Sequence, residues 1–218
     1  MTVKLAVFDC DGTLVDGQGS ICTAMEAAFA HAGIAAPDRH AVRRIVGLSL
    51  PHAVSRLIPQ ADERTVADVV EAYKSAYRAA RASGELAEPL FDGIVPLLNA
   101  LRADGWLLGV ATGKSSRGLS HCLATHSLSD HFITLQTADH HPSKPHPEML
   151  EAALAEAFAA PAQAVMIGDT AYDMQMACNA DVRAIGVDWG YHEPHELRAA
   201  GAEWVASSPR ELGEYLLK

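Results

Sequence analysis

The chain has 218 residues, 49% of them hydrophobic and 20% charged, and it carries a formal net charge of −10 at pH 7. This composition is typical of a soluble globular protein, and the acidic balance argues against nucleic acid or an anionic membrane as a partner. No segment is apolar over the length of a membrane span, the first residues lack a signal-peptide pattern, and the four cysteines form no CxxC pair. We therefore expect a cytoplasmic protein with reduced thiols and no obligate protein partner.

The chain begins with a predicted strand that ends in two acids. Residues 3–8 are almost all apolar, which is typical of a strand buried on both faces of a parallel sheet. Asp9 and Asp11 follow directly, and because residues i and i+2 of a strand point the same way, both carboxylates are expected to reach one site. Two carboxylates that close repel each other unless a proton or a cation lies between them. Gly12 and Thr13 then offer a sharp turn, backbone amides and a hydroxyl to an anion.

The next part of the chain, residues 16–87, is helical throughout in its pattern. Helices are expected over about 21–32, 38–46, 52–58 and 62–81, with prolines at the breaks. Because this insertion is far too long for a loop, we expect a small helical domain that covers residues 16–87. Residues 1–15 and 88–218 then form the other domain.

From Asp92 onward, strand and helix patterns alternate. Strands are expected at 106–111, 132–136, 164–168, 182–187 and 204–206, and helices at about 93–103, 116–126, 148–158, 171–179, before 200 and before 217. This alternation predicts an α/β fold, a doubly wound parallel sheet with helices on both faces.

Polar residues follow several of these strands, at the sheet edge where ligands bind in open parallel sheets. Thr112 and Gly113 offer a hydroxyl and an amide to a phosphate oxygen, and Lys144 lies between prolines that hold its backbone. Asp169 leaves a strand and Asp173 follows one helical turn later. Together with Asp9, these two acids are suited to a divalent cation.

This order of motifs resembles the haloacid-dehalogenase-like hydrolase superfamily. The four motifs are the DCDGT run at 9–13, Thr112 at a strand end, the lysine-proline pair at 144–145 and the GDTAYD run at 168–173. The likeness covers the whole chain, with a Rossmann-like core and an inserted α-helical cap, and it is greatest to the phosphoglycolate-phosphatase-like branch. Dehalogenases of the superfamily generally lack an aspartate at the position of Asp11, so its presence favours phosphoryl transfer.

The resemblance implies a Mg²⁺-dependent phosphatase that hydrolyses a small phosphorylated metabolite, such as a phosphoglycolate-like phosphomonoester. It makes Asp9 the nucleophile, which forms an aspartyl-phosphate, and Asp11 the general acid and base. The resemblance also implies that Thr112, Gly113 and Lys144 bind the phosphoryl oxygens. Mg²⁺ would be bound by Asp9, the Asp11 carbonyl, Asp169 and Asp173.

The cap is expected to help select the leaving group. A turn that starts at Gly47 separates two cap helices, and Arg43 and Arg44 precede it by about one helical turn. Either arginine can bind a second anionic group on the substrate. In the equally plausible alternative, both arginines are solvated residues on the helix surface.

Other readings remain open. A phosphomutase of the β-phosphoglucomutase type uses the same motifs, and a non-catalytic binding protein can retain the fold. A phosphonate hydrolase needs a cap lysine, and the cap offers only Lys74, deep in a predicted helix. The remaining polar residues have simpler interpretations. We expect His140, His141 and His146 in an exposed loop and His192 and His195 on the surface. Cys10 is expected to pack in the interior.

Overall fold

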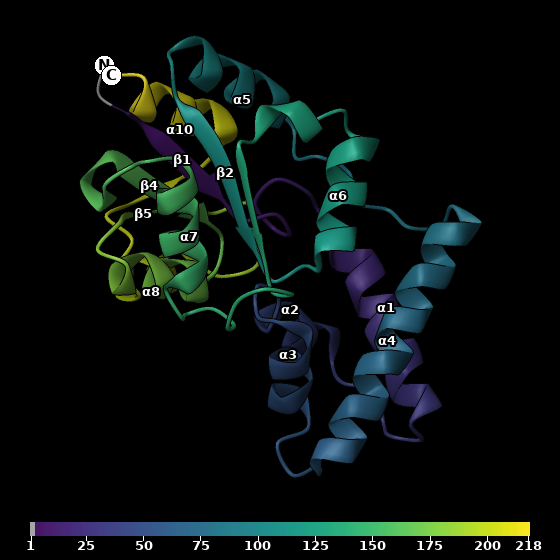
Figure 1. Ribbon diagram of the computed structural model, residues 1–218. Helices are drawn as coiled ribbons and strands as arrows, with labels where there is room; N and C mark the ends of the chain where they lie inside the picture. The colour runs from purple at the N-terminus through teal and green to yellow at the C-terminus, as the bar shows by residue number, and fades with distance from the viewer. Residues whose placement is uncertain (1–2) are drawn as a thin grey trace.

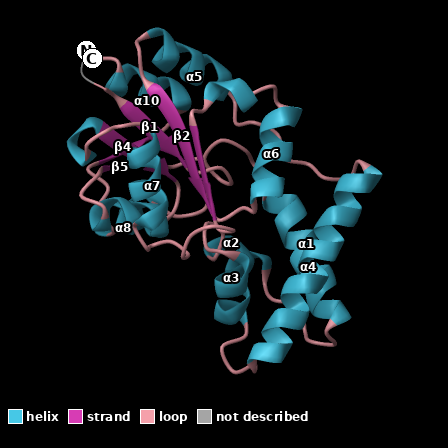
Figure 2. Ribbon diagram, in the orientation of Figure 1, coloured by secondary structure: helices cyan, strands magenta, loops and turns pink. Residues whose placement is uncertain are grey.

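A computed structural model describes residues 3–218, so that Met1 and Thr2 of the predicted core segment 1–15 lie outside the described residues. Six parallel strands form one sheet in the order β3-β2-β1-β4-β5-β6. Figures 1 and 2 show the sheet with helices packed around it. Their bounds are β1 Leu5–Phe8, β2 Leu107–Thr112, β3 Thr134–Thr137, β4 Ala164–Gly168, β5 Arg183–Val187 and β6 Trp204–Ala206. The predicted α/β fold with a parallel sheet is confirmed.

The first strand lies in the middle of this sheet. All four residues of β1 are buried, and Phe8 is paired with Val110 of β2 on one side and Ile167 of β4 on the other. A strand in this position is covered on both faces, which explains its unbroken apolar sequence. The residues that follow β1, β2 and β4 therefore emerge side by side at one edge of the sheet.

Helices cover both faces of the sheet. Leu98, Leu119 and Leu212 belong to the hydrophobic cluster on one face, and Met149 and Ala177 to the cluster on the other. The first face is covered by α5 (Ile94–Ala103), α6 (Ser116–Thr125) and α10 (Pro209–Leu216), and the second by α7 (Glu148–Glu156), α8 (Ala171–Asn179) and α9 (Pro194–Ala199). Two short 3₁₀ turns, η1 (Ser129–His131) and η2 (Pro161–Gln163), lie between these elements.

The predicted cap is a group of four helices beside the sheet edge, in which α1 and α4 run along each other (Figure 1). Their bounds are α1 Gln18–His31, α2 Arg39–Arg44, α3 Leu50–Leu57 and α4 Glu63–Ser83. They share a hydrophobic cluster of their own, which includes Met25, Phe29 and Val69. The Asp62 side chain accepts a hydrogen bond from the Thr65 amide (2.8 Å) at the start of α4, as expected of an N-cap residue.

Two differences in the cap have local causes. Helix α3 begins at Leu50, earlier than expected, because a proline at position 51 is tolerated in the first turn of a helix. Helix α2 ends at Arg44 rather than at 46, because residues 45–48 already form the turn that leads into α3.

Two chain segments connect the cap to the sheet domain. The Asp16 amide donates to the Pro89 carbonyl (2.8 Å), and Val15 forms an isolated antiparallel bridge with Leu90. The predicted domain boundaries at 15/16 and 87/88 lie at this crossing and stay a prediction. Within residues 3–218, no helix is both long and apolar enough to cross a bilayer.

Candidate active site

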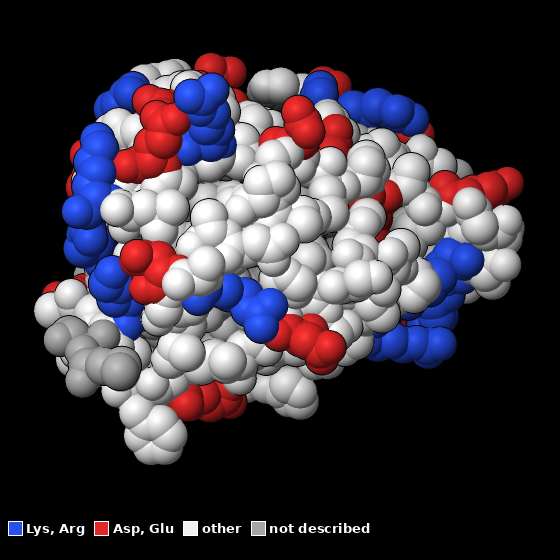
Figure 3. All heavy atoms as spheres, turned by 90° about the horizontal axis from the view of Figure 1, so that it is seen from above, with Lys and Arg blue, Asp and Glu red and all other residues white. Residues whose placement is uncertain are grey.

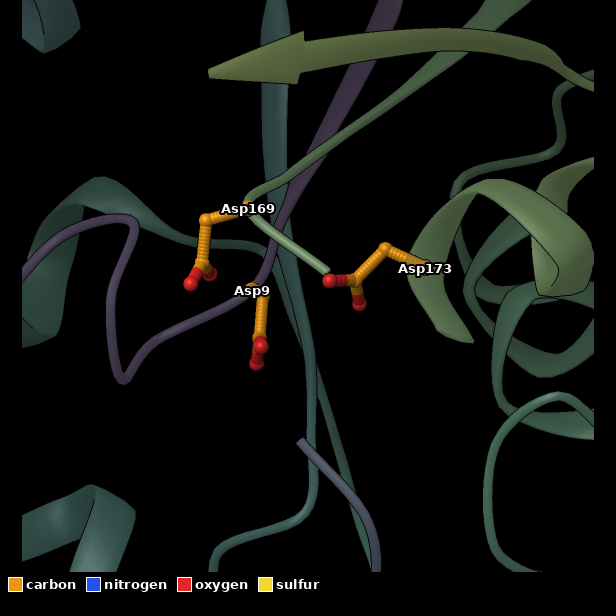
Figure 4. Close-up of side chains that lie close together, drawn as sticks. All are labelled: Asp9, Asp169 and Asp173. Carbon is orange, nitrogen blue, oxygen red and sulfur yellow. The ribbon is translucent and has the colours of Figure 1, made fainter. Parts of the chain in front are cut away.

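Three carboxylates converge at the edge of the sheet. Asp9 follows β1, Asp169 follows β4 and Asp173 lies in the first turn of α8, and one oxygen of each lies within 4.8 Å of the others (Figure 4). All three side chains are fully buried. The sequence placed these acids at the ends of neighbouring elements, and the structure brings them together.

Asp169 is held in place from both sides. Thr13 Oγ1 donates to its Oδ1 (2.8 Å), and the Tyr191 amide donates to its Oδ2 (3.0 Å). Gly12 has a φ of +84°, and a side chain there would run into the Asp169 carboxylate. Thr13 therefore orients Asp169 and Gly12 leaves room for it, and the expected role of both residues in binding the substrate stays a prediction.

Lys144 lies between two of the acids. Only 1% of its surface is exposed, and its Nζ is 2.6 Å from Asp173 Oδ1 and 3.0 Å from Asp9 Oδ1. Burial works against its charge, but the two carboxylates outweigh burial and raise the pKa of Lys144 above its usual value. The other oxygen of Asp173 accepts from the Thr170 hydroxyl (2.7 Å) and amide (3.0 Å), so both of its oxygens have protein donors.

The charge of this cluster fits a divalent cation. Burial raises the pKa of Asp9 to about 7 despite the nearby Lys144, and burial together with the neighbouring acids raises that of Asp169 well above its usual value. Asp9 Oδ2 is buried and has no hydrogen-bond partner. With all groups ionised, three carboxylates and one ammonium leave two negative charges among oxygen ligands, which is the environment that Mg²⁺ prefers.

Asp11 stands apart from this cluster. Lys114 Nζ lies 2.8 and 3.0 Å from its two carboxylate oxygens and 2.6 Å from Glu88 Oε1, and the Tyr77 hydroxyl donates to the same Glu88 oxygen (2.6 Å). Burial raises the pKa of Asp11, although Lys114 opposes this. The expectation that both carboxylates share one site holds only in part, because each has its own ammonium group. Lys114 directly follows Thr112 and Gly113 at the end of β2, and this position in the sequence could have identified it as a site residue.

A cavity of about 340 Å³ lies between this edge and the cap. Asp9, Asp11, Thr112 and Gly113 line it from the sheet, and Gly47 lines it from the cap. A Cβ on Gly113 would lie 2.5 Å from the Leu48 carbonyl oxygen and 2.7 Å from that of Gly47. The cap turn therefore rests directly on the end of β2, and the cap is closed over the acids.

Neither Arg43 nor Arg44 is among the residues that line this cavity, within the described part of the chain. Arg43 donates to Gln18 Oε1 (3.1 Å), and Arg44 forms a two-bond ion pair with Glu196 of α9 (2.5 and 2.6 Å). In this structure α2 turns both toward other partners, and their role as substrate-binding residues stays a prediction. The cap cations that do line the cavity come from α4, and the sequence interpretation missed them as site residues: Lys74, Arg78 and Arg81.

Other expectations have mixed outcomes. His192 is only 4% exposed, because its ring packs between the cap and the sheet domain and contacts the Arg44 carbonyl oxygen (3.2 Å), so the surface position was wrong. His195 is exposed as expected. Cys10 is buried and packs beside Cys122. Lys74 lines the cavity, but Glu71 holds its ammonium group (2.8 Å).

The family model of haloacid dehalogenase-like hydrolases matches residues 6–187. The chain belongs to this family. It is 35% identical over 212 residues to the probable phosphatase IndB of Dickeya dadantii (strain 3937), with 95% of this chain and 91% of that protein covered. It is 26% identical to a phosphoglycolate phosphatase of Vibrio vulnificus (strain YJ016), with 99% and 96% covered.

Solved structures agree with this membership. A predicted phosphatase from Clostridium acetobutylicum superposes with a TM-score of 0.89 at 27% identity, over 100% of this chain and 99% of that one. The family, its fold and the enzyme class predicted from the four motifs are thereby confirmed: the chain is a phosphatase of the haloacid dehalogenase-like hydrolase family.

Proposed function

We propose that this family member is a Mg²⁺-dependent phosphatase that hydrolyses a small phosphomonoester through an aspartyl-phosphate on Asp9. The observation that carries the proposal is the buried carboxylate of Asp9, whose Oδ2 has no hydrogen-bond partner and which borders the cavity below the cap. A nucleophile needs a free lone pair that faces its substrate, and this oxygen has one.

Two carboxyl groups perform the proposed reaction. A carboxylate oxygen of Asp9 forms a bond to phosphorus while the bond from phosphorus to the leaving oxygen breaks. Asp11 donates its proton to that oxygen, which suits an acid whose pKa is raised by burial. A water then attacks the phosphorus of the aspartyl-phosphate, Asp11 takes the water's proton, and Asp9 is released as the carboxylate.

The residues around Asp9 stabilise the charge in both steps. Lys144 keeps its proton between Asp9 and Asp173 and supplies a fixed positive charge at the phosphoryl end of the cavity. Thr112 and Gly113 line the cavity at the end of β2, where a hydroxyl and an amide can donate to phosphoryl oxygens. The carboxylates of Asp9 and Asp169 and the Asp11 carbonyl would hold Mg²⁺, with Asp173 in support. When bound, the ion supplies positive charge that offsets the phosphoryl oxygens and the acids.

The substrate of this proposal is a phosphorylated metabolite. A cavity of about 340 Å³ is near the lower end for small-molecule sites. Basic and acidic side chains intermingle on the face seen in Figure 3, where no broad basic surface of the kind that binds nucleic acid is drawn. The Vibrio vulnificus relative named phosphoglycolate phosphatase supports a phosphoglycolate-like ester.

The proposal is tested by measuring phosphate release from a panel of phosphorylated metabolites, with Mg²⁺ and with excess chelator. We expect phosphate release with Mg²⁺ and none with chelator. Transfer of the phosphoryl group to another sugar position, without release of phosphate, would instead indicate a phosphomutase. Binding of phosphorylated metabolites without any turnover would indicate a non-catalytic protein.

A further inference from the structure

The cap wall of the cavity carries a regular row of side chains from α4. Tyr73, Tyr77 and Arg81 are spaced four residues apart, and Lys74 and Arg78 lie next to them. Residues four apart lie above one another on one helix face. All five line the cavity. Helix α4 therefore gives the cavity an aromatic strip with cations beside it.

The aromatic strip is rigid. The rings of Tyr73 and Tyr77 stack with centroids 5.6 Å apart and an interplanar angle of 24°. The Tyr77 hydroxyl is fixed by its hydrogen bond to Glu88 (2.6 Å). Met25 and Leu48 also line the cavity, so its middle has an apolar surface against which a hydrocarbon or aromatic ring can pack.

Two cations lie around the ring of Tyr77. Lys114 Nζ is 5.7 Å and Arg81 Cζ is 5.9 Å from the ring centroid. Lys114 is the cation that also binds Asp11. The two charges therefore mark two places along the cavity, one at the catalytic acids and one farther along α4.

The cations of this wall differ in what they already bind. Lys114 is neutralised by Asp11 and Glu88, and Lys74 is paired with Glu71. Arg81 is half-buried, its Nε is buried without a hydrogen-bond partner, and no ion pair to it is found among residues 3–218. A buried donor without a partner costs free energy until a ligand supplies an acceptor. Arg78 and Arg117 also line the cavity, and no ion pair to either is found among residues 3–218, but both are exposed to solvent. Arg81 is thus the cavity cation with a buried donor that a ligand would satisfy.

We propose that Arg81 is a specificity-determining residue that binds an anionic group on the leaving group. The substrate would then be a phosphomonoester with an apolar or aromatic body that ends in a second anion. This rests on the proposed function, because it takes the phosphoryl end to lie at Asp9. A carboxylate and a second phosphate both offer paired oxygens that match a guanidinium group. Within the class of phosphoglycolate-like esters, the aromatic strip favours a substrate with a larger body than glycolate, which has a single methylene between its two ends.

The inference is tested by binding, independently of turnover. Phenylphosphonate and para-carboxyphenylphosphonate cannot be hydrolysed and differ only in the carboxylate, and each is titrated calorimetrically into the Mg²⁺-loaded protein. We expect the carboxylate to tighten binding by about tenfold in the natural protein, which is about 1.4 kcal/mol. Arg81→Ala should remove this preference, and Arg81→Lys should keep part of it because the charge remains.

Arg64→Ala is the matched control, since Arg64 is an exposed arginine of the same helix that does not line the cavity. It should leave the carboxylate preference unchanged. A third ligand, para-phenylenediphosphonate, shows whether a second phosphate is preferred over a carboxylate. Equal affinity for the two phosphonates, no binding of either, or the same preference in Arg81→Ala would overturn the assignment.

Kinetics separate this inference from the proposed function. Phenyl phosphate and para-carboxyphenyl phosphate are compared as substrates of the natural protein and of Arg81→Ala. Release of phosphate from both esters, with a ratio of kcat/KM that Arg81→Ala does not change, overturns only the role of Arg81. A carboxylate preference in binding without any phosphate release supports the role of Arg81 and counts against the phosphatase.

Discussion

At the residue scale, the position of Asp9 decides the chemistry. Its carboxylate is fully buried, one oxygen accepts from Lys144 and from the Cys10 amide, and the other has no partner. No other acid in the described chain combines burial, an unpartnered oxygen and a place in the cavity lining. A substitution that keeps the shape and removes the charge therefore tests its role directly.

We predict that Asp9→Asn abolishes phosphate release while the protein stays folded. The amide is a poor nucleophile, and it also relieves part of the repulsion among the buried acids, so the melting temperature should not fall. Steady-state kinetics and a thermal melt measure the two effects, and mass spectrometry of the natural protein during turnover should find the phosphoryl group on Asp9. Asp104→Asn, a change in an exposed acid, is the control. A phosphorylated residue other than Asp9 would refute the assignment.

Residue types alone could not give the direction in which some side chains point. Thr13 offers a hydroxyl that suits a substrate anion and Asp169 equally well, and only the folded backbone shows that it bonds Asp169. His192 lies in a polar sequence, and its burial results from the cap lying over it. Asp9, Asp169 and Asp173 were predictable as a group, because the ends of parallel strands meet at one sheet edge whatever the details of packing.

At the scale of elements, the contact between the cap turn and β2 depends on a missing side chain. Gly113 leaves room for the carbonyl oxygens of Gly47 and Leu48. Its φ is not in the left-handed region, so alanine fits the backbone and the only cost is the contact with the cap. This makes the glycine a sensitive probe of cap closure.

We predict that Gly113→Ala lowers kcat/KM for the best substrate by about tenfold or more. A methyl group there forces the cap turn away from the strand end, at a cost of about 1–3 kcal/mol for the closed arrangement. Gly19→Ala is the control, because a Cβ at that helical position meets no atom within 4 Å. Equal kcat/KM values for Gly113→Ala and the natural protein would show that closure does not involve this contact.

Another contact between the cap and the sheet domain is the ion pair between Arg44 of α2 and Glu196 of α9. The hydrogen bonds from Arg44 lower the pKa of Glu196 from 4.5 to about 2. Since the folded state has the lower pKa, the stabilisation is fully present above pH 4.5 and is lost as the pH falls toward 2.

We predict that Glu196→Gln lowers the melting temperature near neutral pH, and that its difference from the natural protein disappears toward pH 2. The pair is partly exposed, so solvent screening limits its contribution to about 0.5–1 kcal/mol, or roughly 1–4 °C. Thermal melts of both proteins from neutral to acid pH measure the difference between their melting temperatures. The other carboxylates titrate in both proteins, so their effect cancels in this difference. A difference that stays constant from neutral to acid pH would refute the link to Glu196.

Helices were predictable as elements, but their rotation was not. The pattern of residues 38–46 indicated a helix, yet it could not show that α2 turns Arg44 toward α9. In α4 the same spacing that marks a helix also places Tyr73, Tyr77 and Arg81 on one face, but which face meets the cavity depends on how the cap lies over the sheet. The convergence of the acids at the strand ends was therefore predictable, and the side chains that α4 turns into the cavity were not.

At the scale of the whole molecule, burial opposes ionisation of Asp9 and Asp169, and a bound cation would offset this cost. We predict that saturating Mg²⁺ raises the melting temperature relative to chelator. A ligand at about 100 times its dissociation constant stabilises by about 2.7 kcal/mol, which corresponds to roughly 5–10 °C for a chain of this size. Asp169→Asn should remove most of the shift. Equal melting temperatures with Mg²⁺ and with chelator would count against a metal at these acids.

The central place of β1 in the sheet also governs the order in which the molecule can be assembled during synthesis. Of the six strands, β1 leaves the ribosome before the others, but one of its two neighbours, β4, begins only at Ala164. At about 5–20 residues per second, the nascent β1 therefore waits roughly 8–30 s for that neighbour. The cap helices, which emerge in between, have most of the partners in their own hydrophobic cluster much sooner. Asp9 is thus made long before the residues that surround it in the folded protein, so a chain that stops before β4 lacks Asp169 and Asp173 beside it.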